Sequence, residues 1–176
     1  MNLAAILLAG TAAVTSLQKA LDASADWTME RRLPGSSRVL VSSGEVDCRA
    51  GEGITWQVLK PFVSSVAMTT NAMIFTDEDG RRVKSLDELP RYEEIRRATD
   101  AFASGATNAF DDVFDIREEA LPDGGWRLVF TPEVAAMRRL FTAIELTGAA
   151  LPTNAVLTTG DGGTTVIRFK ERPRVR

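Results

Sequence analysis

The stretch that decides the fold is Gly44 to Thr76, GEVDCRAGEGITWQVLKPFVSSVAMTTNAMIFT, in which short apolar runs are separated by turns. Within each run an apolar residue recurs at every second position. The runs are Val46 and Cys48, then Ile54, Trp56 and Val58, then Val66 and Met68, and last Met73 and Phe75. A period of two is typical of strands with one apolar and one polar face. The stretch therefore predicts consecutive antiparallel strands.

Similar alternation extends the predicted sheet on both sides of this stretch. Upstream strands are expected at Trp27 to Leu33, which ends in the turn Pro34-Gly35, and at Arg38 to Ser43. The turn residues Asp77 to Gly80 lack the ligand spacing of a calcium loop, so they indicate a hairpin. Downstream strands are expected at Ile116 to Leu121, Trp126 to Thr131, Leu140 to Thr147, Ala155 to Thr159 and Thr164 to Lys170. The sequence thus predicts about ten strands.

Helical spacing occurs in a few segments. An amphipathic helix is predicted over Ser85 to Ser104, because Tyr92, Ile95, Ala98 and Phe102 recur at intervals of three and four. A shorter stripe contains Val14, Leu17 and Leu21 near the start of the chain. Single helical turns are expected around Phe110 to Phe114 and at Pro132 to Arg139. Residues 1–13 are either a secretory signal segment or the start of the first helix.

Length and charge limit the classes of protein that the chain can represent. The 176 residues suit a single domain over 1–176 with one sizeable core. The 21 basic and 24 acidic residues give a formal net charge of -3 and are interspersed along the chain, which disfavours nucleic acid as a partner. The basic tail Lys170 to Arg176 is interpreted as a solvated end.

The chain contains no histidine and one cysteine, Cys48. This composition excludes Ser-His-Asp and Cys-His catalysis, histidine zinc sites and an intrachain disulfide. Cys48 is interpreted as a packed side chain, because no histidine could activate it. Neither a dinucleotide fingerprint nor a P-loop occurs, and Gly160 to Gly163 is interpreted as a hairpin turn. We expect neither enzymatic activity nor a cofactor or metal.

A long antiparallel sheet curls, and helices with apolar stripes need a surface to cover. The helices could pack directly on the concave face and make a dry core, or they could form a lid over a cavity. Periodicity does not separate these two arrangements.

The segment Gly44 to Phe62 resembles the motif of the periplasmic outer-membrane lipoprotein carrier (LolA-like) family. It contains Gly-Glu-Val, a short turn, Ile-Thr-Trp and then Lys-Pro-Phe. Weaker resemblance extends to Trp27-Thr28-Met29, Trp126 to Pro132 and Phe141 to Gly148. One departure is the turn Arg49-Ala50-Gly51, where typical carriers have an Arg-Pro pair whose arginine takes part in lipoprotein hand-over. The resemblance therefore indicates a divergent member of the family.

The resemblance implies an α+β fold, an unclosed and strongly curved antiparallel β-barrel with two or three helices packed as a lid over its concave face. It further implies a periplasmic, non-enzymatic carrier that shelters the acyl chains of a lipoprotein or other lipid-linked cargo. Membrane-bound donor and acceptor proteins would be its partners, and a monomer is favoured.

Expected lining residues share the apolar phase of their elements. They are Trp56, Val66, Met68, Met73, Phe75 and Phe130 from the sheet, with Ile95 and Phe102 from the lid helix. The alternative hypothesis is a ligand-free interaction protein, in which the same sheet has a packed core and binds a protein partner. An enzyme acting on a lipid through unidentified carboxylates ranks third.

Overall fold

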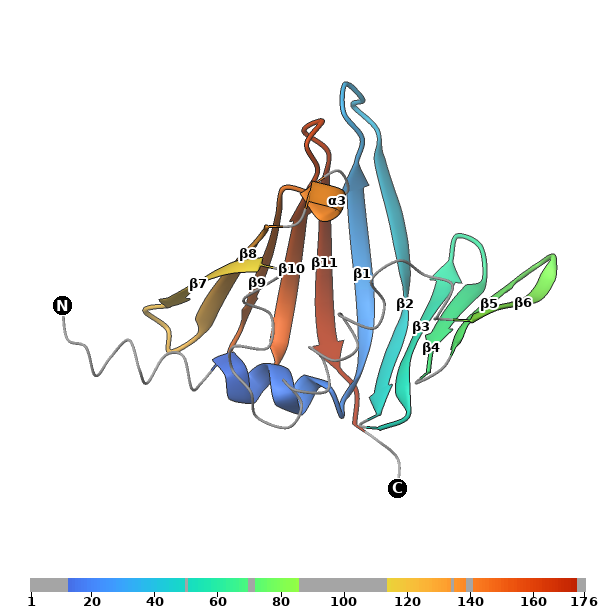
Figure 1. Cartoon of the computed structure of the whole chain (residues 1–176), viewed down its shortest axis with the longest axis horizontal. Helices are drawn as coiled ribbons and strands as arrows, with labels where there is room; N and C mark the ends of the chain where they lie inside the picture. Colours follow the sequence, from blue (N-terminus) through green and yellow to red (C-terminus); the bar gives the residue numbers. More distant parts are fainter. Residues whose placement is uncertain are drawn as a thin grey trace.

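A computed structural model describes residues 13–49, 51–69, 72–85, 114–133, 135–138 and 141–173. Most of these residues belong to one sheet of 11 strands, in the order β6-β5-β4-β3-β2-β1-β11-β10-β9-β8-β7. The sheet is curved and does not close, so β6 and β7 lie at its two ends (Figure 1). The strands are β1 (Ser24–Arg32), β2 (Val39–Arg49), β3 (Gly53–Lys60), β4 (Ser64–Met68), β5 (Ala72–Asp77), β6 (Gly80–Ser85), β7 (Phe114–Ala120), β8 (Trp126–Pro132), β9 (Ala143–Gly148), β10 (Pro152–Thr158) and β11 (Thr164–Glu171).

The structure confirms consecutive antiparallel strands over Gly44 to Thr76, which form most of β2 and then β3, β4 and β5. The count of about ten strands becomes 11, because Gly80–Ser85 pairs with β5 as the second strand of the hairpin. Ser85, expected to begin a helix, is the last residue of this strand. Residues 80–85 carry no helical spacing of their own, so pairing with β5 determines the structure there.

The predicted helices agree only in part with the structure. Residues 13–20 are helical, and α3 (Ala135–Arg138) is the single turn expected after β8. The rest of the predicted helix at 85–104 lies outside the described residues, so the lid remains a prediction. No helix in the described ranges is long and apolar enough to cross a membrane.

Phe114 was expected in a helical turn, and this expectation is wrong. It is the first residue of β7 and pairs with Pro132. Its ring lies 5.7 Å from Phe130 at 84° and 6.3 Å from Phe141 at 19°, measured between ring centroids. These aromatic contacts across the sheet outweigh the weak local helical pattern.

Register places alternate residues of every strand on an apolar face. One row of partners crosses the sheet through Ala25, Val46, Trp56, Val66 and Phe75. The next row through Cys48, Ile54, Met68 and Met73 lies on the same face. Within each strand, the residue in one row is two positions from the residue in the other row. Such residues lie on the same face of a pleated sheet.

The opposite, polar face carries cross-strand ion pairs. Arg168 binds Glu30 at 2.8 Å, Arg172 binds Glu45 at 2.5 Å, and Arg127 binds Glu145 at 2.7 Å. The side chains of these pairs are half-exposed, so water screens the attraction and each pair adds little to stability. Their main effect is to mark the face that water covers.

Two tryptophans lie over glycines of neighbouring strands on the apolar face. Trp27 pairs in register with Gly44, and Trp126 pairs with Gly148; each indole is only 1% exposed. A Cβ added at Gly44 would lie 2.7 Å from the Trp27 ring, and one at Gly148 would lie 2.8 Å from the Trp126 ring. The indole N–H of Trp126 donates to the carbonyl oxygen of Ala149 at 2.7 Å. The absent side chains of the two glycines therefore make room for the largest buried rings.

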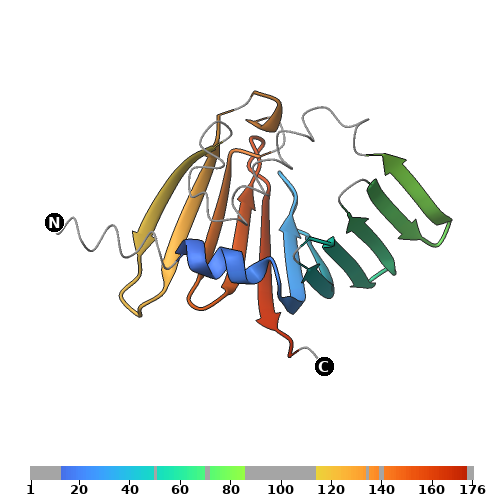
Figure 2. The same ribbon diagram turned by 60° about the horizontal axis from the view of Figure 1, so that its bottom comes forward.

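The helix at residues 13–20 covers one half of the apolar face. Ala13 belongs to a core cluster with Trp126 and Leu128, and Leu17 packs against that cluster. Figures 1 and 2 show this helix crossing the sheet near one end of the strands. The described helix lies over the β8 to β11 side of the sheet and away from β4 to β6 (Figures 1 and 2).

We expect Gly44→Ala to destabilise the protein by about 3 kcal/mol or more, because the added Cβ cannot be accommodated without moving backbone. It would lie 1.8 Å from the carbonyl oxygen of Gln57. Urea unfolding measures the loss. Gly160→Ala is the matched control, since its Cβ meets only Thr142 at 3.7 Å and should change stability by less than about 0.5 kcal/mol. Equal stability of the two variants would contradict the close packing at Gly44.

The pH dependence of stability tests whether Glu118 lies on the apolar face. It pairs with Leu128 on that face, and desolvation raises the pKa of its carboxyl. The folded state therefore holds the proton more tightly than the unfolded state, and stability falls as pH rises through the ordinary glutamate pKa to the raised one. We expect Glu118→Gln to remove this loss and to be the more stable protein at pH 7.

The control for this pH dependence is Glu119→Gln, on the polar face, where the carboxylate binds Arg127 at 3.1 Å. This substitution should not raise stability at pH 7. Chemical unfolding of both variants from pH 4 to pH 8 makes the comparison. A Glu118→Gln protein that is less stable than the wild type at pH 7 would contradict the assigned face.

Candidate functional site

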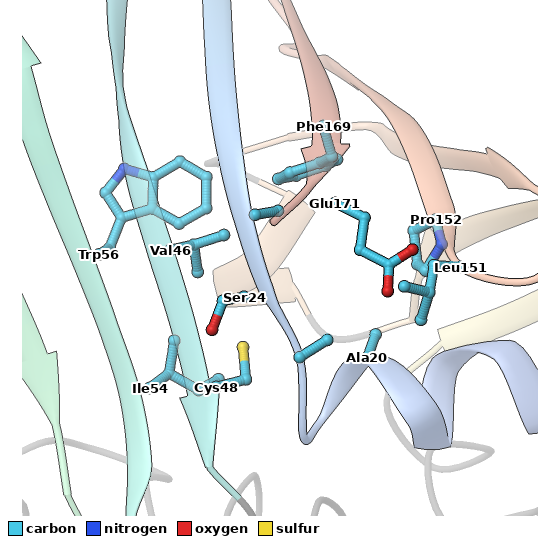
Figure 3. Close-up of a pocket in the computed structure, with 12 residues that line it drawn as sticks. Ala20, Ser24, Val46, Cys48, Ile54, Trp56, Leu151, Pro152, Phe169 and Glu171 are labelled. Atoms are coloured by element: carbon cyan, nitrogen blue, oxygen red, sulfur yellow. The ribbon is translucent and has the colours of Figure 1, made fainter. Parts of the chain in front are cut away.

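An apolar pocket of about 280 Å³ lies on the apolar face where the helix at residues 13–20 meets β1. Figure 3 shows its side chains converging from the sheet on one side and from the helix end and the β9–β10 turn on the other. The lining residues are Ala20, Ala23, Ser24, Ala25, Val46, Cys48, Ile54, Trp56, Leu151, Pro152, Phe169 and Glu171. Most of them are apolar, so the pocket suits a hydrocarbon group.

Strand pairing explains how distant segments meet in the pocket. Ala25 of β1 pairs with Glu171 of β11 on one side and with Val46 of β2 on the other. Val46 in turn pairs with Trp56 of β3. Because these residues lie side by side on one face, they form a continuous floor. The small side chains of Ala20, Ala23 and Ala25 leave space above that floor.

Aromatic contacts fix one wall of the pocket. The ring of Trp56 stacks on Trp27, with centroids 4.8 Å apart and planes at 24°. Phe169 meets Trp56 edge-on at 6.2 Å and 87°. Trp27 is fully packed beneath this pair, so Trp56 rests on a rigid support. The wall is therefore formed before any ligand arrives.

Few polar groups line the pocket. The hydroxyl of Ser24 is already hydrogen-bonded to the carboxylate of Asp47. Cys48 places a half-buried thiol in the lining, and Glu171 is exposed at the rim. Within the described ranges no three histidine, cysteine, aspartate or glutamate side chains come together to hold a metal ion. The arrangement favours binding of an apolar group over acid–base chemistry.

The structure places the expected lining residues in three locations. Trp56 lines the pocket, and Val66, Met68, Met73 and Phe75 continue the same face along β4 and β5, each half-buried. Phe130 lies on this face too, but it packs against the cluster beneath the helix at residues 13–20. Ile95 and Phe102 lie outside the described residues. Their roles as ligand contacts stay predictions.

Sequence reasoning did not include several pocket residues. Phe169 and Glu171 come from the last strand, Leu151 from the turn before β10, and Pro152 from the start of β10. The alternation over Thr164 to Lys170 signalled a strand, yet no local pattern shows that β11 pairs with β1. Val46, Cys48 and Ile54 carried a usable signal, since they share the apolar phase with Trp56.

Arg49 lies outside the pocket, beside a second and more polar hollow of about 310 Å³. Its guanidinium binds Asp47 at 3.0 Å and Glu52 at 3.7 Å. These carboxylates, Asp47 first, raise the pKa of Arg49, so the side chain is cationic at every relevant pH. The arginine that stands nearest to the carrier family's hand-over position is therefore engaged with carboxylates on its own hairpin.

No protein-family model matches the chain, and no curated protein matches it. Solved structures with a similar course of the chain include the MucA/MucB complex of Pseudomonas aeruginosa, with a TM-score of 0.48 and 14% identity over 95% of this chain. The chain spans 58% of that structure's chain.

A LolA superfamily protein from Nitrosomonas europaea gives a TM-score of 0.40 and 9% identity, covering 93% of this chain and 94% of that one. A putative outer membrane lipoprotein-sorting protein domain from Vibrio parahaemolyticus gives 0.42 and 11%, covering 93% of both chains. Similar structures thus include members of the family that the Gly44 to Phe62 motif resembles.

Cys48 is the only cysteine of the chain and lines the pocket, so its alkylation reports whether the pocket is filled. We expect dodecanoate to slow the reaction of Cys48 with N-ethylmaleimide severalfold, because an apolar chain beside the sulfur excludes the reagent. Acetate, which has the carboxylate but no chain, is the control. Mass spectrometry of quenched samples gives the rates. Equal rates with and without dodecanoate would contradict binding beside Cys48.

Proposed function

We propose that the protein is a non-enzymatic carrier that shelters an acyl chain of a lipoprotein or other lipid-linked cargo for transfer through the periplasm. The observation that carries the proposal is the apolar pocket between the sheet and the helix at residues 13–20. Membrane-bound donor and acceptor proteins would load and unload it, and a monomer suffices for a pocket built from one chain.

The size of the pocket supports part of an acyl chain as the ligand. An apolar cavity of about 150 Å³ holds one benzene ring, so the 280 Å³ here has room for roughly ten carbon atoms. Burial of ten methylenes contributes about 8 kcal/mol before the cost of association is subtracted. That cost leaves a reversible affinity, which a carrier needs for release.

Longer chains have a continuation of the same surface available. Trp56 of the pocket pairs with Val66, and Val66 pairs with Phe75. Met68 and Met73 form the adjoining row. Methionine side chains adapt to guests of different shape because they are unbranched and flexible. The expected ligand contacts on β4 and β5 would therefore hold the part of a chain that extends beyond the pocket.

The alternative of a ligand-free interaction protein requires a filled core. An open apolar pocket next to a preformed aromatic wall favours the carrier instead, because apolar surface in contact with water is stabilised when an apolar ligand covers it.

We expect Ala20→Phe to lower the affinity for an acyl chain about tenfold or more, because the phenyl ring occupies pocket volume. Lys19→Phe is the matched control: the residue is exposed on the same helix and does not line the pocket. Displacement of a hydrophobic fluorescent probe by dodecanoate measures both affinities.

Native mass spectrometry after gentle purification, followed by lipid extraction, tests the natural cargo. A wild-type protein that carries no acyl species and binds no probe would overturn the carrier proposal. Probe binding that is equal in the two variants would show that the ligand occupies another site.

A further inference from the structure

Exposed large apolar side chains gather at the end of the sheet opposite the pocket. Within the described residues, all except Val83 belong to two segments. The β1–β2 hairpin contributes Leu33 and residues 39–41, and the end of β3 with the β3–β4 turn contributes Leu59, Phe62 and Val63. We call these residues the end patch. Phe62 is 72% exposed and Val41 is 63% exposed.

The two segments of the end patch are neighbours. Pairing between β2 and β3 ends at Ser43 and Lys60. Residues 39–42 of β2 extend past this point, and the β3–β4 turn begins beside them. Those residues pair only with β1, where Leu40 meets Arg31 and Val39 meets Arg32. Figure 1 shows this hairpin projecting beyond the end of β3.

The hairpin exposes apolar side chains on both of its faces. Leu40 lies on the apolar face of the sheet, whereas Val39 and Val41 lie on the polar face. A single covering layer could bury only one of these sets, because successive residues of a strand point to opposite faces. An environment that surrounds the hairpin is needed to remove both from water. Exposed apolar groups gathered in this way mark an interaction site.

Basic side chains accompany the end patch although the whole chain is acidic, with a net charge of -3. Arg31, Arg32, Arg38 and Lys60 lie in or beside its two segments, and no ion pair among the described residues involves Arg32, Arg38 or Lys60. One nearby acid, Glu30, binds Arg168 at 2.8 Å.

Asp161, in the turn between β10 and β11, is close enough to Arg31 to be influenced by its charge. It accepts hydrogen bonds from the hydroxyl of Thr159 and the N–H of Gly163, and these bonds, with the charge of Arg31, lower its pKa. Asp161 is thus an acid near Arg31, whereas Arg32, Arg38 and Lys60 form no ion pair within the described part of the chain.

We propose that the end patch docks on the surface of a lipid bilayer that contains anionic headgroups. The apolar side chains of the hairpin and the turn enter the boundary between headgroups and acyl chains, while the basic side chains contact phosphate groups. A bilayer interface surrounds a projecting hairpin on both faces, which a flat protein surface does not. The inference is independent of what occupies the pocket, because the two sites lie at opposite ends of the strands.

Co-flotation with vesicles tests the proposal. The wild-type protein should float with vesicles of phosphatidylcholine and phosphatidylglycerol at low salt, and binding should weaken as salt screens the phosphates. Vesicles of phosphatidylcholine alone should bind it much more weakly. If the patch contacts a protein instead, the wild type will not float with protein-free vesicles of either composition, and the proposal is overturned.

Matched substitutions test which residues make the contact. Phe62→Ser should weaken binding to the anionic vesicles about tenfold, from the loss of a buried ring. Val41→Ser should weaken binding as well, whereas Val83→Ser, at a side chain 53% exposed on β6, should not. Arg38→Gln should cost about fivefold, and Arg117→Gln on β7 is its control.

Fluorescence quenching measures whether the β3–β4 turn inserts into the bilayer. In Phe62→Trp, quenching by brominated lipids in anionic vesicles should exceed that of the wild type. Trp27 and Trp126 are 1% exposed, and any quenching of Trp56 in the pocket is common to both proteins. Unfolding curves check that each variant is folded. Equal binding of Phe62→Ser and Val83→Ser, or quenching in Phe62→Trp that does not exceed that of the wild type, would overturn the proposal. Ala20→Phe changes the pocket and not the end patch, so it should bind vesicles like the wild type. Vesicle binding and acyl-chain binding therefore test the two proposals separately.

Discussion

The contact of two indoles with two glycines is the constraint on which the rest of the structure depends. Trp27 over Gly44 holds β1 against β2, and Trp126 over Gly148 holds β8 against β9. Each indole occupies the space that a side chain on the glycine would fill. The ring therefore packs directly on the backbone of the neighbouring strand. The helix at residues 13–20 then packs on the second indole, and Trp56 packs on the first. The pocket lies where those two arrangements meet.

Much of the strand structure could be predicted because each strand carries its own period of two. The phases of Ile54 with Trp56, Val66 with Met68 and Met73 with Phe75 all place their residues on the apolar face. Less predictable were segments whose conformation depends on partners. Phe114 is in a strand because it packs against Phe130 and Phe141, and neither contact has a local signal.

Of the lining residues expected from the sequence, Trp56 lines the apolar pocket, and its role as a ligand contact stays a prediction. The wall contributed by β11 could not be derived, because periodicity determines which face a side chain occupies and gives no information on which strands are neighbours. The pairing of β1 with β11 brings Phe169 and Glu171 to Ala25 from the other end of the chain. Pairing between strands so far apart in sequence depends on how the whole sheet assembles. Neither strand alone carries a signal for it.

The stacked indoles of Trp27 and Trp56 have a spectroscopic consequence. Two identical chromophores with centroids 4.8 Å apart couple their electronic transitions, and a coupled pair gives a circular dichroism band of opposite lobes that an isolated indole lacks. Trp126 lies in the other cluster and does not take part in this stack. The protein therefore contains a natural optical reporter in the wall of its pocket, sensitive to any tilt of Trp56 relative to its support.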